Sequence, residues 1–226
     1  PCFQQNRPPR YVRHGSFSRS SDYRTLYRWR CRNCGKTFST ATLNACFKQH
    51  KRRVNPKLYQ LMCSGVSMRR AAKLLHIHQV TAMRKIHFLA EQARKKHAVY
   101  LEKFRDVPLK DLFFDEMETF EHTKLKPVSI VLSVSVKREI LHMGVAEMPA
   151  KGPLAAKSRE KYGFRKDERP EVLKEMLAAI APFINANATF RSDQNPNYPK
   201  ALFQQFPNAR HVTTKGGRAA VVGQGE

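Results

Sequence analysis

Two short stretches, far apart in the chain, each read as a strand that ends in an acidic residue, and the first of them is a continuous apolar run. Leu112–Phe114 lead directly into Asp115, and the stretch 188–193 ends in Asp193. A continuous apolar run is typical of a central strand that is covered on both faces. A carboxylate next to such a run is costly to bury unless something binds it. A βαβ crossover would make the two strands parallel neighbours, so we expect Asp115 and Asp193 to end adjacent strands and to share divalent metal ions.

The charge of the chain points to a nucleic-acid partner. The formal net charge is +24 and the sequence pI is about 10.3, which is typical of proteins that bind polyanions. Residues 1–105 hold 24 Lys and Arg against 3 Asp and Glu, whereas residues 106–226 hold 18 against 15. A solvated surface without a partner usually mixes both signs. We therefore expect the first half to bind nucleic acid. Since no apolar run of about 18 residues occurs, we expect no membrane partner.

The cysteines favour a zinc site over disulfide bonds. The chain has 5 cysteines, an odd number, and Cys31 and Cys34 are separated by two residues, a pattern that favours metal binding in a reducing compartment. Gly35 provides the permissive backbone that a tight turn beside two thiolates requires. Zinc takes four ligands, and we expect Cys2 as the third and a residue before Pro1 as the fourth. Residues 1–54 would then form a zinc ribbon.

A second set of zinc ligands remains open. Cys31, Cys34, Cys46 and His50 resemble the ligands of a C-x2-C and H-x3-H finger. The gap between Cys34 and Cys46 is 11 residues, which is shorter than the usual spacing. The ribbon is therefore favoured over the finger.

Residues 55–105 have the pattern of three helices joined by short turns. Ser67 caps the second helix, and the third begins at Gln79. Small side chains, Ala71 and Ala72, lie where the second helix would cross the third, which is typical of a helix-turn-helix. A plain three-helix bundle with basic faces is the alternative.

A recognition helix enters the major groove by its N-terminal residues, while neighbouring basic residues contact phosphates. The candidate groove-facing side chains are Gln79, Thr81, Arg84 and Lys85, and the candidate phosphate contacts are Arg69 and Arg70.

Residues 106–226 change to an α/β pattern. After the Asp115 strand, two β runs form an antiparallel meander, and a helix, the Asp193 strand, a short helix and a final strand follow. These elements are expected at 128–136, 140–146, 171–180, 198–206 and 211–214. The order β-β-β-α-β-α-β indicates a mixed sheet of the ribonuclease-H-like type. A basic, turn-rich segment covers 149–169, and its part Lys151–Lys166 is expected near the rim of the acidic site, where it would hold a DNA backbone.

Two neighbouring aspartates suggest phosphodiester chemistry. Carboxylates a few ångström apart repel each other, and Mg²⁺ or Mn²⁺ relieves that repulsion. Two such ions, about 3.5–4 Å apart, can activate an attacking oxygen and stabilise a leaving one. An aspartate before a turn is common on structural grounds alone, so it is the joint placement of Asp115 and Asp193 that carries the prediction.

The order of these pieces resembles the DDE-type transposases of bacterial insertion sequences, which have a zinc ribbon, a helix-turn-helix and a ribonuclease-H-like catalytic domain. The matching motifs lie at Arg30–Ser39, Gly65–Ala72, Phe114–Glu116 and Ser192–Tyr198. The resemblance implies three domains, at 1–54, 55–105 and 106–226, and both chain ends look cut, with the last domain incomplete at its C-terminus.

The resemblance also implies roles and partners. Asp115 and Asp193 match the first two catalytic acids, and Glu226, 33 residues after Asp193, is the candidate third. The implied cofactors are structural Zn²⁺ and catalytic Mg²⁺ or Mn²⁺. The implied setting is a homo-oligomer on double-stranded DNA, at element ends and targets, in the bacterial cytoplasm at the nucleoid. Two other functions stay open: a sequence-specific DNA-binding regulator, and a nuclease of the same fold.

Overall fold

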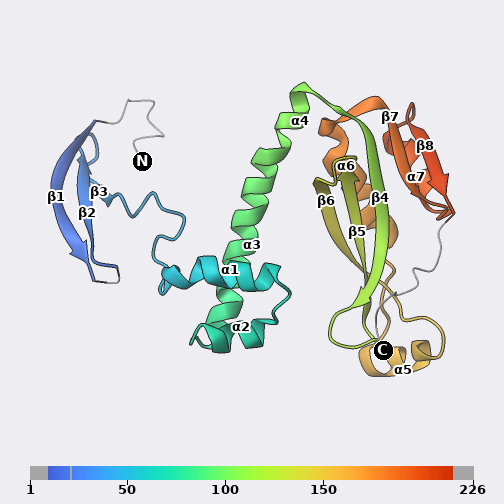
Figure 1. The fold of residues 1–226 in the computed structure, drawn as a ribbon, viewed down its shortest axis with the longest axis horizontal. Coiled ribbons are helices and arrows are strands. Elements are labelled where there is room, and N and C mark those ends of the chain that lie inside the picture. The colour runs from blue at the N-terminus through green and yellow to red at the C-terminus, as the bar shows by residue number, and fades with distance from the viewer. Residues whose placement is uncertain (1–9, 21, 216–226) are drawn as a thin grey trace. The chain divides into compact units, whose positions relative to one another are not determined.

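A computed structural model describes residues 10–20 and 22–215 of the chain (Figure 1). The chain divides into two compact units, residues 1–94 and 95–226. The first unit begins with a three-stranded antiparallel sheet in the order β1-β2-β3, formed by Tyr11–Arg19, Arg24–Cys31 and Thr37–Ser39. The predicted strand over 24–31 is confirmed, whereas β1 was not predicted.

Three helices follow the sheet: α1 (Asn55–Cys63), α2 (Met68–Leu74) and α3 (Gln79–Leu101), with a short 3-10 turn, η2 (Arg52–Val54), before them. A proline lies in the first turn of α1, where its missing N–H costs nothing. The Ser67 hydroxyl accepts the backbone N–H of Arg70 at 3.4 Å and so caps α2. The three helices therefore begin where the sequence predicted. None of the described helices is long and apolar enough to cross a membrane.

The second unit is a mixed α/β structure built on a five-stranded sheet in the order β6-β5-β4-β7-β8. Strands β4, β5 and β6 form the predicted antiparallel meander, and β7 and β8 run parallel to β4. The strands are β4 (Leu109–Phe120), β5 (Pro127–Ser135), β6 (Ile140–Glu147), β7 (Ile184–Asp193) and β8 (Arg210–Thr214). The helices are α4 (Lys103–Asp106), α5 (Leu154–Tyr162), α6 (Arg169–Ile180) and α7 (Tyr198–Gln205), with a 3-10 turn, η3 (Ala181–Phe183), after α6.

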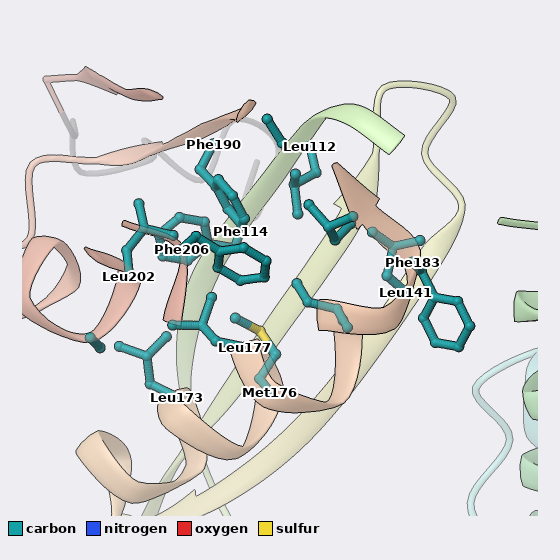
Figure 2. Packing of buried hydrophobic residues seen from close by; sticks show 14 of the residues in the cluster. Leu112, Phe114, Leu141, Leu173, Met176, Leu177, Phe183, Phe190, Leu202 and Phe206 are labelled. Carbon is teal, nitrogen blue, oxygen red and sulfur yellow. The ribbon is translucent and has the colours of Figure 1, made fainter. Parts of the chain in front are cut away.

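One face of this sheet packs on α6 and α7 (Figure 2). Leu112, Phe114 and Phe190 from the central strands meet Met176 and Leu177 of α6, and all five side chains are at most 2% exposed. Side chains alternate across a strand, so the neighbours of these core residues lie on the opposite face of the sheet. The buried residues of β4 thus determine the face on which Asp115 lies.

The structure corrects two details of the predicted second unit. Asp115 does not end its strand, because β4 continues to Phe120 and pairs with β5 as far as Phe120 opposite Pro127. The basic segment 149–169 is not all turn, because it contains the helix α5.

Candidate functional site

Asp115 and Asp193 come from adjacent parallel strands. The register pairs Leu112 with Phe190 and Phe113 with Arg191, and two further residues along each strand lead to Asp115 and Asp193. Both aspartates therefore have matching heights and lie on the face opposite the α6 side. The parallel, adjacent arrangement expected from the sequence is thus observed.

The two aspartates line one cavity of about 520 Å³. Its wall is formed by β4, β7 and β8, and includes Phe113, Val212 and Thr214 beside the acids. Strand β7 ends at Asp193, whereas β4 continues beyond Asp115. Because β7 ends at Asp193, Asp115 lies where the pairing between β4 and β7 ends. Both carboxylates therefore lie at the end of the paired strands, beside the cavity.

The electrostatics of the pair suit a cation. Burial is the main cause that raises the pKa of the Asp115 carboxyl above its ordinary value, and the charge of Asp193 raises that pKa further. The backbone N–H of Glu116 donates to Asp115 Oδ1 at 2.8 Å and opposes the shift. The backbone N–H of Asn195 donates to Asp193 Oδ1 at 3.1 Å and orients that carboxylate. Two repelling carboxylates with free oxygens are ligands that Mg²⁺ or Mn²⁺ accepts.

The structure describes no third acid beside the pair. Glu116 alternates onto the other face of the sheet, where the Ser129 hydroxyl donates to its carboxylate at 3.2 Å. Glu226 lies outside the described residues. Across residues 10–20 and 22–215, no group of three or more His, Cys, Asp or Glu side chains is arranged so that it could hold a metal ion.

Arg191 is a functional candidate that sequence reasoning missed. It lines the same cavity as the two acids, and its guanidinium lies 3.2 Å from Asp111 Oδ1. The signal was present in the sequence, because Arg191 lies two residues before Asp193 and a strand places such residues on one face. A guanidinium beside two carboxylates can hold a phosphate group.

The basic segment 149–169 does not lie where the sequence reasoning placed it. None of its side chains lines the acidic cavity. Lys151 pairs with Glu118 at 2.6 Å, and Glu118 alternates onto the face opposite Asp115. Arg165 is only 8% exposed and donates to the carbonyl oxygens of Met148 and Pro127. The expectation that this segment forms the rim of the cavity is corrected, and Lys151 and Arg165 are engaged by Glu118 and by backbone carbonyls of the second unit.

Cys31 and Cys34 flank a tight turn after β2. Cys31 ends β2, and the Gly35 N–H donates to the Cys31 carbonyl at 2.9 Å, with Gly35 in the left-handed region at φ +67°. Cys2 lies outside the described residues, so the ribbon set is untested. The finger set is not brought together in the described part of the chain. Instead, the Cys46 thiol lies 3.6 Å from the side-chain amide of Asn55.

Five of the six candidate DNA contacts remain accessible. Arg69 and Arg70 are exposed on α2, Gln79 and Arg84 are exposed on α3, and Thr81 is half-buried. Gln79, Thr81 and Arg84 lie in the first two turns of α3, the part of a recognition helix that enters the major groove.

Lys85 is a correction. It is 3% exposed, and its ammonium donates to Asn55 Oδ1 and to the His50 carbonyl, each at 2.9 Å, and to Gln49 Oε1 at 3.3 Å. Burial lowers the pKa of Lys85 from its ordinary value. A side chain held by three internal acceptors does not face a DNA groove, so Lys85 is a structural residue of the first unit.

The comparisons with known proteins are sparse. No protein-family model matches the chain, and no curated protein matches it. Among solved structures, RNase H1 from the halophilic archaeon Halobacterium salinarum NRC-1 is similar at 12% identity and a TM-score of 0.25, over 46% of this chain and 84% of that one. A likeness this low carries no argument about the activity of the chain.

Proposed function

We propose that the chain is a DDE-type DNA transposase, which cleaves and joins DNA strands by metal-dependent phosphodiester transfer. One observation carries the proposal: Asp115 and Asp193 reach the same cavity from adjacent parallel strands, at matching heights and on one face of the sheet. The strand order, with an antiparallel meander followed by two parallel strands, supports a ribonuclease-H-like assignment of the second unit.

In this proposal each residue of the cavity has a separate role in the reaction. Bound Mg²⁺ or Mn²⁺ would activate the attacking oxygen and stabilise the leaving one. Asp115 and Asp193 hold the ions, and the Asn195 N–H fixes the orientation of one carboxylate. Arg191 lies on the same wall of the cavity, where its guanidinium would orient the phosphate that reacts.

The first unit would bring DNA to this site. Residues 1–94 hold 20 Lys and Arg against 2 Asp and Glu, a charge that favours a polyanion. In this proposal α2 and α3 form a helix-turn-helix, with Gln79, Thr81 and Arg84 in the major groove and Arg69 and Arg70 on phosphates. Zn²⁺ on Cys31, Cys34 and Cys2 would stabilise the small β-sheet. The proposed partners are double-stranded DNA and further copies of the chain on it, in the bacterial cytoplasm.

The experiment compares strand cleavage by the wild type and by carboxylate variants. With supercoiled plasmid and Mn²⁺, Asp115→Asn and Asp193→Asn should each abolish nicking while DNA affinity stays unchanged. Glu118→Gln is the matched control, because it removes a carboxylate from the opposite face of the same strand. Nicking that survives both aspartate changes, or that is lost equally in the control, would refute the proposal.

A sequence-specific DNA-binding regulator is the second candidate, and the strongly basic first unit favours it. It predicts selective duplex binding without metal-dependent nicking. That outcome, with intact affinity for one DNA sequence, would decide for the regulator.

A further inference from the structure

The first unit contains a basic cavity to which the proposed helix-turn-helix contacts and the proposed zinc site assign no role. It has a volume of about 700 Å³. Its cations come from two segments far apart in sequence, the hairpin that joins β1 to β2 and the residues just before α1. They are Arg19, Arg24, Lys51, Arg52 and Arg53, and among the described lining residues Asp22 is the one acid beside them. The lining therefore carries an excess of four positive charges.

Asp22 fixes the spacing of these cations. Its carboxylate accepts from the Arg19 guanidinium at 2.5–2.7 Å and from the Arg52 guanidinium at 2.7 Å. One acid thus ties the hairpin to a segment 30 residues away. Lys85 braces the same wall from α3, because its ammonium donates to Gln49 and Asn55, which also line the cavity. The cavity is therefore held in shape before any ligand arrives, which lowers the ordering cost of binding.

Two other cations of the cavity have side chains without a hydrogen-bond or ion-pair partner among the described residues. Lys51 and Arg53 are exposed, and within residues 10–20 and 22–215 neither side chain makes a hydrogen bond or an ion pair. Arg24 approaches Asp22 only at 4.0 Å and its side chain is 79% exposed. Unneutralised cations around a concavity attract an anion that several of them can contact together.

We propose that this cavity binds the phosphodiester backbone of DNA, as a contact separate from the faces of α2 and α3. The size of the cavity favours a backbone segment over a single phosphate ion, because its volume lies in the range of sites for much larger ligands, and its cations come from two separate segments. The inference rests on the proposed function only in that the first unit binds DNA; it does not depend on the acids of the second unit.

The test uses the full chain and a short fluorescent duplex over a range of salt concentrations. The variant Lys51→Gln/Arg53→Gln removes two cavity charges, and the matched control Arg32→Gln/Lys36→Gln removes two exposed charges from the turn between β2 and β3. Each lost phosphate contact reduces the slope of log affinity against log salt by about 0.9. We expect the cavity variant to lose about two units of slope and the control to keep the wild-type slope. Unchanged melting curves would show that both variants fold.

Chemical acetylation of lysines, measured by mass spectrometry, shows whether the cavity binds a DNA backbone or free inorganic phosphate. Duplex should protect Lys51 in the wild type and leave Lys36 reactive, whereas inorganic phosphate at the same ionic strength should protect neither. Protection by inorganic phosphate alone would overturn the backbone assignment, and so would equal slopes for the two variants. If the wild type binds no duplex at all, the proposed function fails together with the inference; if it binds and the cavity variant behaves as the control, the inference alone fails.

Discussion

Replacing Lys85 by methionine is expected to destabilise the first unit while leaving its DNA-binding surface in place. The methionine keeps the apolar stem but removes the ammonium that donates to Asn55, His50 and Gln49 at 2.9–3.3 Å. Three acceptors around a side chain that is 3% exposed would then lose their donor, and water has little access to replace it.

The magnitude follows from these contacts. Hydrogen bonds to a charged group contribute about 1.5–3 kcal/mol each, but the buried ammonium has a desolvation cost that its removal relieves. Breaking one side of a buried charged arrangement costs about 3–5 kcal/mol. We therefore expect Lys85→Met to lower the free energy of unfolding by about 3 kcal/mol.

The pH dependence has a definite sign. Burial lowers the folded pKa of Lys85 below the unfolded value, so the unfolded chain binds more protons between the two pKa values. The wild type should therefore gain stability relative to Lys85→Met as the pH rises through that window toward the ordinary lysine pKa.

Urea unfolding, followed by far-ultraviolet circular dichroism and by Trp29 fluorescence, measures the change in stability. Duplex binding is compared under conditions in which both proteins are folded. The control is Arg84→Met, an exposed neighbour on α3, which should change stability by less than about 0.5 kcal/mol but weaken sequence preference. The reasoning is refuted if Lys85→Met keeps wild-type stability and weakens sequence preference as Arg84→Met does.

Three further predictions concern the second unit. Gly144→Ala should cost about 1–3 kcal/mol in urea unfolding, because the new Cβ would lie 2.5 Å from Val172 Cγ1, and Val172→Ala in the same chain should restore part of the loss. Hydrogen bonds to Glu139, of which that from the Lys103 ammonium has the largest effect, lower the pKa of Glu139 to about 2. The stability that Glu139 contributes is therefore present above its unfolded pKa and is lost as the pH falls toward about 2. The difference in melting temperature between the wild type and Glu139→Gln should disappear over that pH range. Arg191→Gln should slow metal-dependent nicking by about 100-fold without changing duplex affinity, and an equal loss of affinity would contradict its proposed role of orienting the reacting phosphate.

The placement of the two acids could be predicted from the sequence because it follows from local rules. The period of two along a strand fixes which residues share a face, and the handedness of a βαβ crossover makes β4 and β7 parallel neighbours. The continuation of β4 to Phe120 was missed, because Glu116 and Glu118 read as a polar turn. Pairing with β5, a contact between separate segments, keeps those residues in the strand.

The positions that sequence reasoning misjudged depend on distant partners. Helical spacing puts Lys85 near the start of α3, but only the folded segment around Asn55 shows that three acceptors surround it. The basic segment 149–169 was expected to hold DNA, yet Glu118 engages Lys151, and backbone carbonyls engage Arg165. In both cases the sequence showed that the side chains are positively charged, but not which groups of the folded protein contact them.

The central claim is that Asp115 and Asp193 hold one divalent metal site. The most direct test is a crystal structure of the chain soaked with Mn²⁺, in which anomalous scattering locates the ion. The account predicts Mn²⁺ about 2.1 Å from carboxylate oxygens of both aspartates, and its loss in Asp193→Asn. Carboxyl groups on opposite faces of the sheet, or more than about 10 Å apart, well beyond the spacing of a two-metal site, would contradict it.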